Sequence, residues 1–100
     1  KCKIDWSEKS FDILNLIRGS NPWPGATTTL FKNKITIWEA KNAGPALAKP
    51  GSIKKIEKKM FVSCKDNEIE IIKIQKSGKN VMDGKNFING IILDKETCFN

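Results

Sequence analysis

The chain has 100 residues, which is enough for one domain with a single modest core. It contains no histidine, and its glycines form no phosphate-binding loop, so the composition argues against a self-contained catalytic site. The 18 basic residues outnumber the 11 acidic ones and give a net charge of +7. This balance favours an anionic partner. All the basic residues of the chain except Arg18 are lysines, which suit loose phosphate contacts.

A helix is the first predicted element, after a leading segment at residues 1–6. Over residues 7–19, apolar side chains recur three and four positions apart, which is typical of an amphipathic helix. Ser7 or Ser10 is the expected N-cap, and Gly19 is a plausible stop. Because a residue before proline avoids the helical region, Asn21 requires the helix to end by about Ser20.

A stiff connector follows the helix at residues 21–25: Asn21, Pro22, Trp23, Pro24 and Gly25. The prolines fix φ, and the indole offers a large apolar body that could hold the helix against a sheet. We therefore expect a structural corner in which Trp23 is substantially buried. The alternative, in which the indole is offered to a nucleic-acid base, stays open at this point.

Short runs with alternating apolar residues predict strands in the remainder of the chain. They span residues 27–31, 34–40, 52–56, 60–64, 68–75 and 91–93, and the run at 68–75 is the longest of them. Tight turns are expected at Lys32-Asn33 and at residues 65–67, and a long loop at residues 41–51. Trp38 falls on the outer face of its strand, where we expect it to pack under the helix; stacking on nucleic acid is the alternative.

Two breaks in the alternation predict irregular strand geometry. Ile53 and Ile56 lie three positions apart, which indicates a bend or bulge between them at residues 54–55. The phase also slips between Ile71 and Ile72, and a β-bulge at that point would turn a barrel corner.

The last part of the chain predicts a short helix and a folded-back tail. Residues 83–90 fit a helix with Asp83 as N-cap and Gly90 as stop, and Phe99 could return to the core. The sequence therefore predicts a mainly β fold with one N-terminal helix and one short late helix, an open OB-like β-barrel of five or six strands. Barrels of this kind commonly serve as nucleic-acid modules.

Several segments together resemble the C-terminal domain of methionyl-tRNA formyltransferases. They are IDWS (4–7), NLIRGSNPWPGA (15–26), KITIWEA (34–40), KPGSI (49–53), GKNVMDGKNFING (78–90) and Phe99. Enzymes of this family transfer a formyl group from 10-formyltetrahydrofolate to initiator methionyl-tRNA in translation initiation. The resemblance implies an open OB-like barrel that helps to hold tRNA, largely without reading its sequence.

The resemblance also implies that the catalytic site lies elsewhere. In this family an N-terminal Rossmann-like domain holds the folate and the catalytic Asn, His and Asp, and none of these maps onto residues 1–100. We therefore expect residues 1–100 to form one domain that has no catalytic, cofactor-binding or metal-binding residues and is inactive alone. We expect it to be either an excised domain or the tail of a longer protein. Its expected partners are tRNA and the parent's catalytic domain.

The lysines are the candidate nucleic-acid-binding residues, in an order of preference. Lys76 and Lys79 come first, because Gly78-Lys79 matches the family's loop, and Lys32 and Lys34 beside the first hairpin come next. A third group clusters around one strand and turn: Lys54, Lys55, Lys58 and Lys59. For each lysine the alternative is an ordinary solvated surface.

The remaining sequence features concern the cysteines and cellular location. Cys2, Cys64 and Cys98 lack metal-ligand spacing and are expected to be reduced thiols. No apolar run reaches the length of a membrane span, and no apolar leader follows the basic start. We expect a cytoplasmic monomer without a membrane partner.

Two other parentages stay open. The same barrel occurs in sugar-nucleotide formyltransferases and in formyltetrahydrofolate dehydrogenase, where it serves architecture or part of a small-molecule cleft. A stand-alone RNA-binding barrel without an enzymatic parent is the third interpretation.

Overall fold

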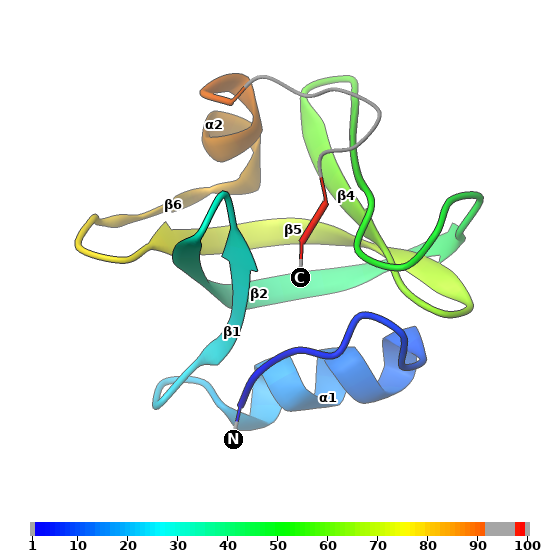
Figure 1. Cartoon of the computed structure of the whole chain (residues 1–100), viewed down its shortest axis with the longest axis horizontal. Coiled ribbons are helices and arrows are strands. Elements are labelled where there is room, and N and C mark those ends of the chain that lie inside the picture. The colour runs from blue at the N-terminus through cyan, green and yellow to red at the C-terminus, as the bar shows by residue number, and fades with distance from the viewer. Residues whose placement is uncertain (1, 92–97, 100) are drawn as a thin grey trace.

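A computed structural model describes residues 2–91, 98 and 99 and contains one antiparallel sheet with a helix on each side (Figure 1). The elements are α1 (Ser10–Gly19), β1 (Ala26–Leu30), β2 (Asn33–Pro45), β3 (Ile53–Ile56), β4 (Lys59–Ser63), β5 (Asn67–Lys76), β6 (Val81–Asp83) and α2 (Gly84–Asn89). The strand order is β1-β2-β5-β4-β3, with β6 also paired to β5. Among the described residues the end strands β1 and β3 do not pair, so the sheet is open, which confirms the predicted fold class.

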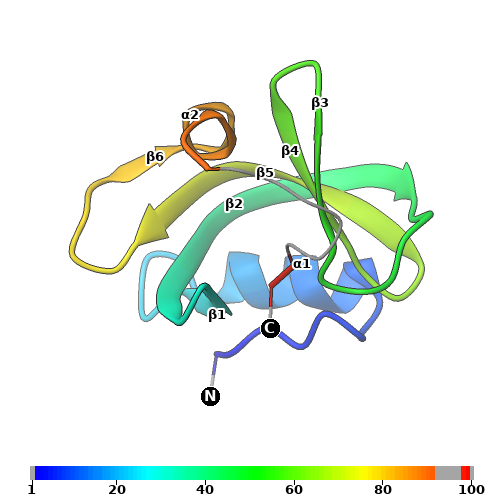
Figure 2. The same ribbon diagram turned by 45° about the horizontal axis from the view of Figure 1, so that its top comes forward.

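The long strands β2 and β5 form the curved middle of the sheet. Helix α1 lies along one side of them, and α2 and the β3–β4 hairpin lie on the other side (Figures 1 and 2). The hairpin pairs with the first half of β5, whereas β6 pairs with its second half. Along the side of β5 that faces away from β2, the first half therefore pairs with β4 and the second half with β6.

Three register shifts shape the pairing of β2 with β5, and the last of them lies between Asn42 and Pro45. Ile37 lies opposite Ile74, whereas Ala40 lies opposite Ile71, and the register shifts between these pairs on both strands. The shift on β5 confirms the predicted bulge at Ile71-Ile72. It brings Ile71 and Ile74, three positions apart, into the same core, where both are buried.

The first hairpin and β2 differ from expectation. The turn residues are Phe31-Lys32, with φ of +50° and +65°, and Asn33 is already paired with Leu30. Strand β2 continues to Pro45, so part of the predicted loop at 41–51 is strand. At 13 residues, β2 is longer than β5, which has 10. The sequence pattern missed this extension because only the pairing partner on β5 makes residues 41–45 a strand.

The β3–β4 hairpin is regular, so the bulge predicted at residues 54–55 is wrong. Its register runs without a shift from Ile53 opposite Val62 to Ile56 opposite Lys59. Ile56 is exposed near the hairpin tip instead of returning to the core. Ile53 and Ile56 are three positions apart because only Ile53 belongs to the core, and the strand between them does not bend.

The late helix is confirmed with the expected cap positions, Asp83 before it and Gly90 after it, but without the expected capping hydrogen bond. The Asp83 side chain pairs instead with Lys73 at 2.9 Å. Strand β6, directly before α2, was not predicted. The strand expected at residues 91–93 lies outside the described residues beyond Ile91, which belongs to no strand.

The end of the chain returns to the core beside the leading segment, as predicted for Phe99. The Phe99 ring stacks on the Trp6 indole, with a centroid separation of 5.4 Å and an interplanar angle of 11°. The Trp6 Nε1–H donates a hydrogen bond to the Thr28 hydroxyl at 2.9 Å, which satisfies its buried polar atom. Both aromatic side chains are buried.

Helix α1 begins with a cap that lies far away in sequence. Neither Ser7 nor Ser10 acts as the N-cap; the N-cap position is Lys9, which makes no side-chain cap. Instead, the Ser10 N–H donates to Asp66 Oδ1 at 2.8 Å, and the Asn67 N–H donates to the same oxygen at 2.7 Å. A carboxylate at a helix N-terminus also opposes the helix dipole favourably.

We predict that the stabilisation by Asp66 depends on pH. The Ser10 N–H hydrogen bond lowers the pKa of the Asp66 carboxyl below 3.8, so the native state favours the ionised form. This contribution is fully present above the unfolded value of 3.8 and is lost as the pH falls through the lowered native pKa. Denaturant unfolding of wild type and Asp66→Asn between about pH 7 and about pH 2 should show the difference in free energy shrinking with acid. A difference that is constant over this range would contradict the assignment.

Gly84 should be intolerant of any side chain. A Cβ at this position would overlap the carbonyl oxygen of Ile71, which is backbone and cannot rotate away. We predict that Gly84→Ala lowers the free energy of unfolding by roughly 1–3 kcal/mol, the range for overpacked sites. Gly19→Ala is the control, because a Cβ there meets nothing within 4 Å. Equal denaturation midpoints for the two variants would show that α2 does not pack on β5 in this way.

Candidate nucleic-acid interface

Four of the predicted lysines lie on or next to the start of β2 and the end of β5, and these two strand ends meet at one end of the sheet (Figure 1). Ile35 is paired with Lys76, and the Ser77 N–H donates to the Lys34 carbonyl at 3.0 Å. The β5–β6 loop then brings Lys79 back toward Lys76, whose carbonyl accepts from the Lys79 N–H at 2.9 Å. We call Lys32, Lys34, Lys76 and Lys79 the basic edge.

The loop that carries Lys79 is held by a side-chain relay from β2. The Trp38 Nε1–H donates to Gln75 Oε1 at 2.9 Å, and Gln75 Nε2 donates to the Lys79 carbonyl at 2.8 Å. Both sides of the Gln75 amide are therefore used. The indole fixes the amide, and the amide fixes the loop backbone, so the position of Lys79 is defined by the sheet.

The charges of the basic edge are not neutralised within the described part of the chain. Three other lysines form ion pairs: Lys54 with Glu68 and Lys73 with Asp83, both at 2.9 Å, and Lys41 with Glu70 at 3.7 Å. No carboxylate among residues 2–91, 98 and 99 lies within 4.0 Å of an ammonium group of the basic edge. The basic edge therefore brings four lysines without a described carboxylate partner to the place where two segments distant in sequence meet.

The third lysine group lies elsewhere, on the β3–β4 hairpin. Figures 1 and 2 both show this hairpin apart from the β5–β6 loop, so the structure does not join its lysines to the basic edge. Lys54 is bound to Glu68 and sits 5.7 Å from the centroid of the Phe61 ring. Lys55 and Lys58 are exposed, and Lys59 is half-buried.

Sequence reasoning missed the apolar side chains that lie among these lysines. Phe31 is 63% exposed at the tip of the first hairpin, and Val81 and Met82 of β6 are also exposed. A pocket of about 350 Å³ is lined by Lys76, Lys79, Asn80, Val81, Met82 and Phe87. The signal that could have found β6 is the apolar pair at residues 81–82 between a polar loop and a helix cap.

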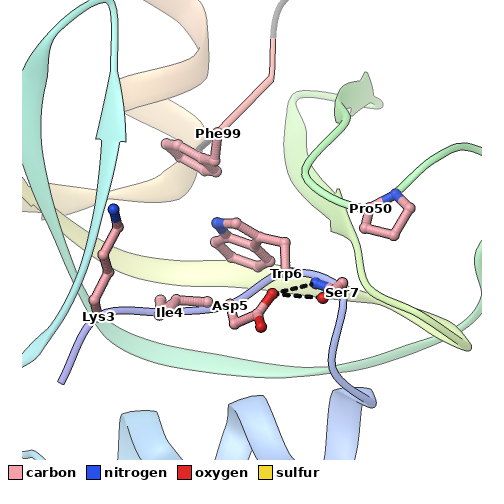
Figure 3. Close-up of a pocket in the computed structure, with 7 residues that line it drawn as sticks. All are labelled: Lys3, Ile4, Asp5, Trp6, Ser7, Pro50 and Phe99. Carbon is pink, nitrogen blue, oxygen red and sulfur yellow. Dashed lines mark hydrogen bonds between the residues drawn. The ribbon is translucent and has the colours of Figure 1, made fainter. Parts of the chain in front are cut away.

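A second pocket, of about 480 Å³, lies beside the leading segment (Figure 3). Its acidic group is already engaged, because the Asp5 carboxylate accepts from the Ser7 N–H at 3.0 Å and from the Ser7 hydroxyl at 2.6 Å. These hydrogen bonds hold the pKa of Asp5 below its usual value. With the stacked Trp6 and Phe99 forming one wall, the site is part of the framework that holds the tail.

Cys64 is a buried cysteine without a disulfide partner. Burial raises the pKa of the Cys64 thiol to about 12, so this thiol is protonated and unreactive near neutral pH. No group of three or more Cys, Asp or Glu side chains in residues 2–91, 98 and 99 could hold a metal ion. No helix in the same part of the chain is long and apolar enough to cross a membrane.

Comparison with known proteins places the chain in a family. The family model for the formyl transferase C-terminal domain matches residues 1–91. This chain belongs to the formyl transferase C-terminal domain family. The chain is 38% identical over 90 residues to the methionyl-tRNA formyltransferase of Bacillus subtilis, covering 87% of this chain and 28% of that protein.

A further relative and a solved structure of similar fold carry other names. The bifunctional polymyxin resistance protein ArnA of Wigglesworthia glossinidia brevipalpis is 37% identical over 87 residues, covering 86% of this chain and 13% of that protein. The crystal structure of HypX from Aquifex aeolicus in complex with tetrahydrofolic acid matches 93% of this chain and 18% of that chain, with a TM-score of 0.72. At 15% identity, this likeness shows the fold alone. The chain spans less than a third of the length of these relatives.

The connector at residues 21–25 differs from expectation in the exposure of its tryptophan. Trp23 is 82% exposed, so the prediction that it is buried is wrong. The helix does end before Pro22, as expected, with Gly19 as its last residue. Asn21 fixes the corner instead, because its Nδ2 donates to the Trp38 carbonyl of β2 at 2.9 Å.

Gly25 forms the second fixed point of the corner. Its N–H donates to the Ser20 carbonyl at 2.8 Å, and its φ of +91° is accessible mainly to glycine. A Cβ at Gly25 would lie 2.7 Å from Thr36 Cγ2 and 2.8 Å from Trp38 Cη2. The backbone therefore approaches the indole of Trp38 closely. Trp38 is half-buried, and a pocket that it lines is also lined by Leu14 and Ile17 of α1, so it lies on the face of the sheet that α1 covers.

We predict that two substitutions in this corner change the free energy of unfolding by different amounts. Trp23→Ala should change the free energy of unfolding by less than about 0.5 kcal/mol, because an exposed side chain buries little surface on folding. Gly25→Ala should lower it by more than about 1 kcal/mol, because both the φ and the space are restricted. Urea denaturation of the two variants measures both values, and a larger destabilisation by Trp23→Ala would restore the indole as the corner's anchor.

Proposed function

We propose that this domain is the tRNA-binding C-terminal domain of a methionyl-tRNA formyltransferase. In this role it assists the formylation of initiator methionyl-tRNA by 10-formyltetrahydrofolate in translation initiation. The proposal is supported by the methionyl-tRNA formyltransferases among its relatives, at 36–38% identity, and by the surface chemistry of the barrel.

The observation that carries the proposal is the basic edge. Lys34 and Lys76 lie on neighbouring strands, and neither is neutralised by a carboxylate of the described residues. An ammonium group on a long flexible stem is suited to phosphate contacts that position a nucleic acid without reading its bases. Lys76 and Lys79, the first group named from the sequence, both line the pocket beside β6, and Lys34 lies on the strand next to Lys76.

Catalysis is assigned to another domain of the parent enzyme. The proposed partners are the tRNA and the parent's N-terminal catalytic domain, which binds 10-formyltetrahydrofolate. We expect the 100-residue chain to be a cytoplasmic monomer. We expect it to have no formyltransferase activity alone, because its own residues supply no histidine base.

A second candidate function is the barrel of another formyltransferase-type enzyme, which acts on a small molecule. The specific observation in its favour is the identity of 37% to ArnA, close to the 38% found for a methionyl-tRNA formyltransferase. The two candidates differ in whether the isolated domain binds tRNA at low salt.

Binding to tRNA should depend steeply on salt and on the basic edge. We predict that Lys76→Gln with Lys79→Gln weakens binding of initiator tRNA and reduces the slope of log K against log salt by about 0.9 for each phosphate that is no longer neutralised. Filter binding at several salt concentrations measures the slope. Absence of tRNA binding by the wild-type domain at low salt would favour the second candidate.

The matched control removes the same charge from another surface. Lys9 and Lys65 are exposed lysines near the start of α1, where the Lys65 N–H donates to the Glu8 carbonyl at 3.0 Å. Lys9→Gln with Lys65→Gln should leave the slope nearly unchanged. An equal weakening by both double variants would mean that net charge, and not the basic edge, determines binding.

A further inference from the structure

The basic edge is not a purely ionic surface, because apolar groups lie between its lysines. Two pockets meet there: the pocket beside β6, of about 350 Å³, and a smaller one lined by Phe31, Ile35, Lys76, Phe87 and others. Lys76 and Phe87 line both pockets. We call these two neighbouring pockets the furrow, and Lys76 and Lys79 are the lysines among their lining residues.

Phe31 occupies an unusual position at one end of this furrow. An aromatic side chain with φ of +50° is uncommon, because turns of this kind favour Asn, Asp or Gly. The strained backbone holds the ring 63% exposed at the tip of the hairpin, directly before Lys32. Strain of this kind is often found at binding sites, and an exposed ring beside a cation suits a flat ligand.

The composition of the furrow discriminates between kinds of nucleic acid. A duplex presents its phosphates and keeps its base faces stacked inside, so it would engage the lysines and leave the apolar walls uncovered. An unpaired nucleotide presents a phosphate and an exposed base face together, and unpaired bases stack on aromatic side chains. The mixed lysine and apolar lining matches the unpaired nucleotide.

We propose that the basic edge binds an unpaired segment of RNA. Its bases stack on Phe31 and enter the pocket walled by Val81 and Met82, while the lysines of the basic edge contact its phosphates. This inference rests on the proposed function, since it takes the partner to be RNA, and it adds that a loop, bulge or single-stranded end is the part that is bound.

The test compares a labelled oligouridine strand with a blunt RNA duplex that carries the same number of phosphates, using fluorescence anisotropy and the full chain. Phe31→Ala should weaken binding of the single strand about tenfold and of the duplex less than about twofold, without changing the salt slope. Met82→Gln, which keeps the size of the side chain and adds a polar amide, should also weaken the single strand selectively.

Phe11→Ala is the matched control, because Phe11 is 70% exposed and lies on α1, far from the furrow in sequence and in fold. It should leave both affinities unchanged. Equal effects of Phe31→Ala on the two probes, or no effect of either furrow variant on the single strand, would overturn the inference while the lysine variants still support tRNA binding. If Lys76→Gln with Lys79→Gln changes binding of neither probe, the proposed function itself fails.

Discussion

The pairing of β2 with β5 is the interaction on which the other elements of this domain rely. These two strands are the longest in the described chain, and every other strand except β3 pairs directly with one of them. Bulges on both strands shift the register and then restore it, so the sheet curves while Ile37, Ile71 and Ile74 all stay buried. The same register places Ile35 opposite Lys76, and this single pairing creates the candidate binding edge.

Trp38 connects the framework of the domain to its candidate surface. Its carbonyl accepts the Asn21 amide at the corner that follows α1, and its indole is approached closely by Gly25. On the other side, its Nε1–H holds Gln75, which holds the loop of Lys79. Residues 21–25 and the loop of Lys79 are therefore connected through one side chain of β2.

The distribution of ion pairs separates lysines that stabilise the fold from lysines that are free to bind. Lys54 and Lys41 pair with Glu68 and Glu70, two nearly buried carboxylates of β5, whereas the basic edge has no such partner in the described residues. Exposed apolar side chains in the same place make the surface suitable for more than phosphate alone.

The amino-acid order was sufficient to predict the local elements: the end of α1 before Pro22, the alternation that buries Ile35 and Ile37, and the bulge at Ile71-Ile72. These features follow from the period of the apolar residues and from proline and glycine, which act within a few positions. Long-range contacts were needed to establish that Asp66 caps α1, that Trp23 is exposed, that β2 extends to Pro45 and that Lys34 lies beside Lys76. Each of these depends on segments far apart in the chain coming together, and local periodicity carries no information about which segments meet.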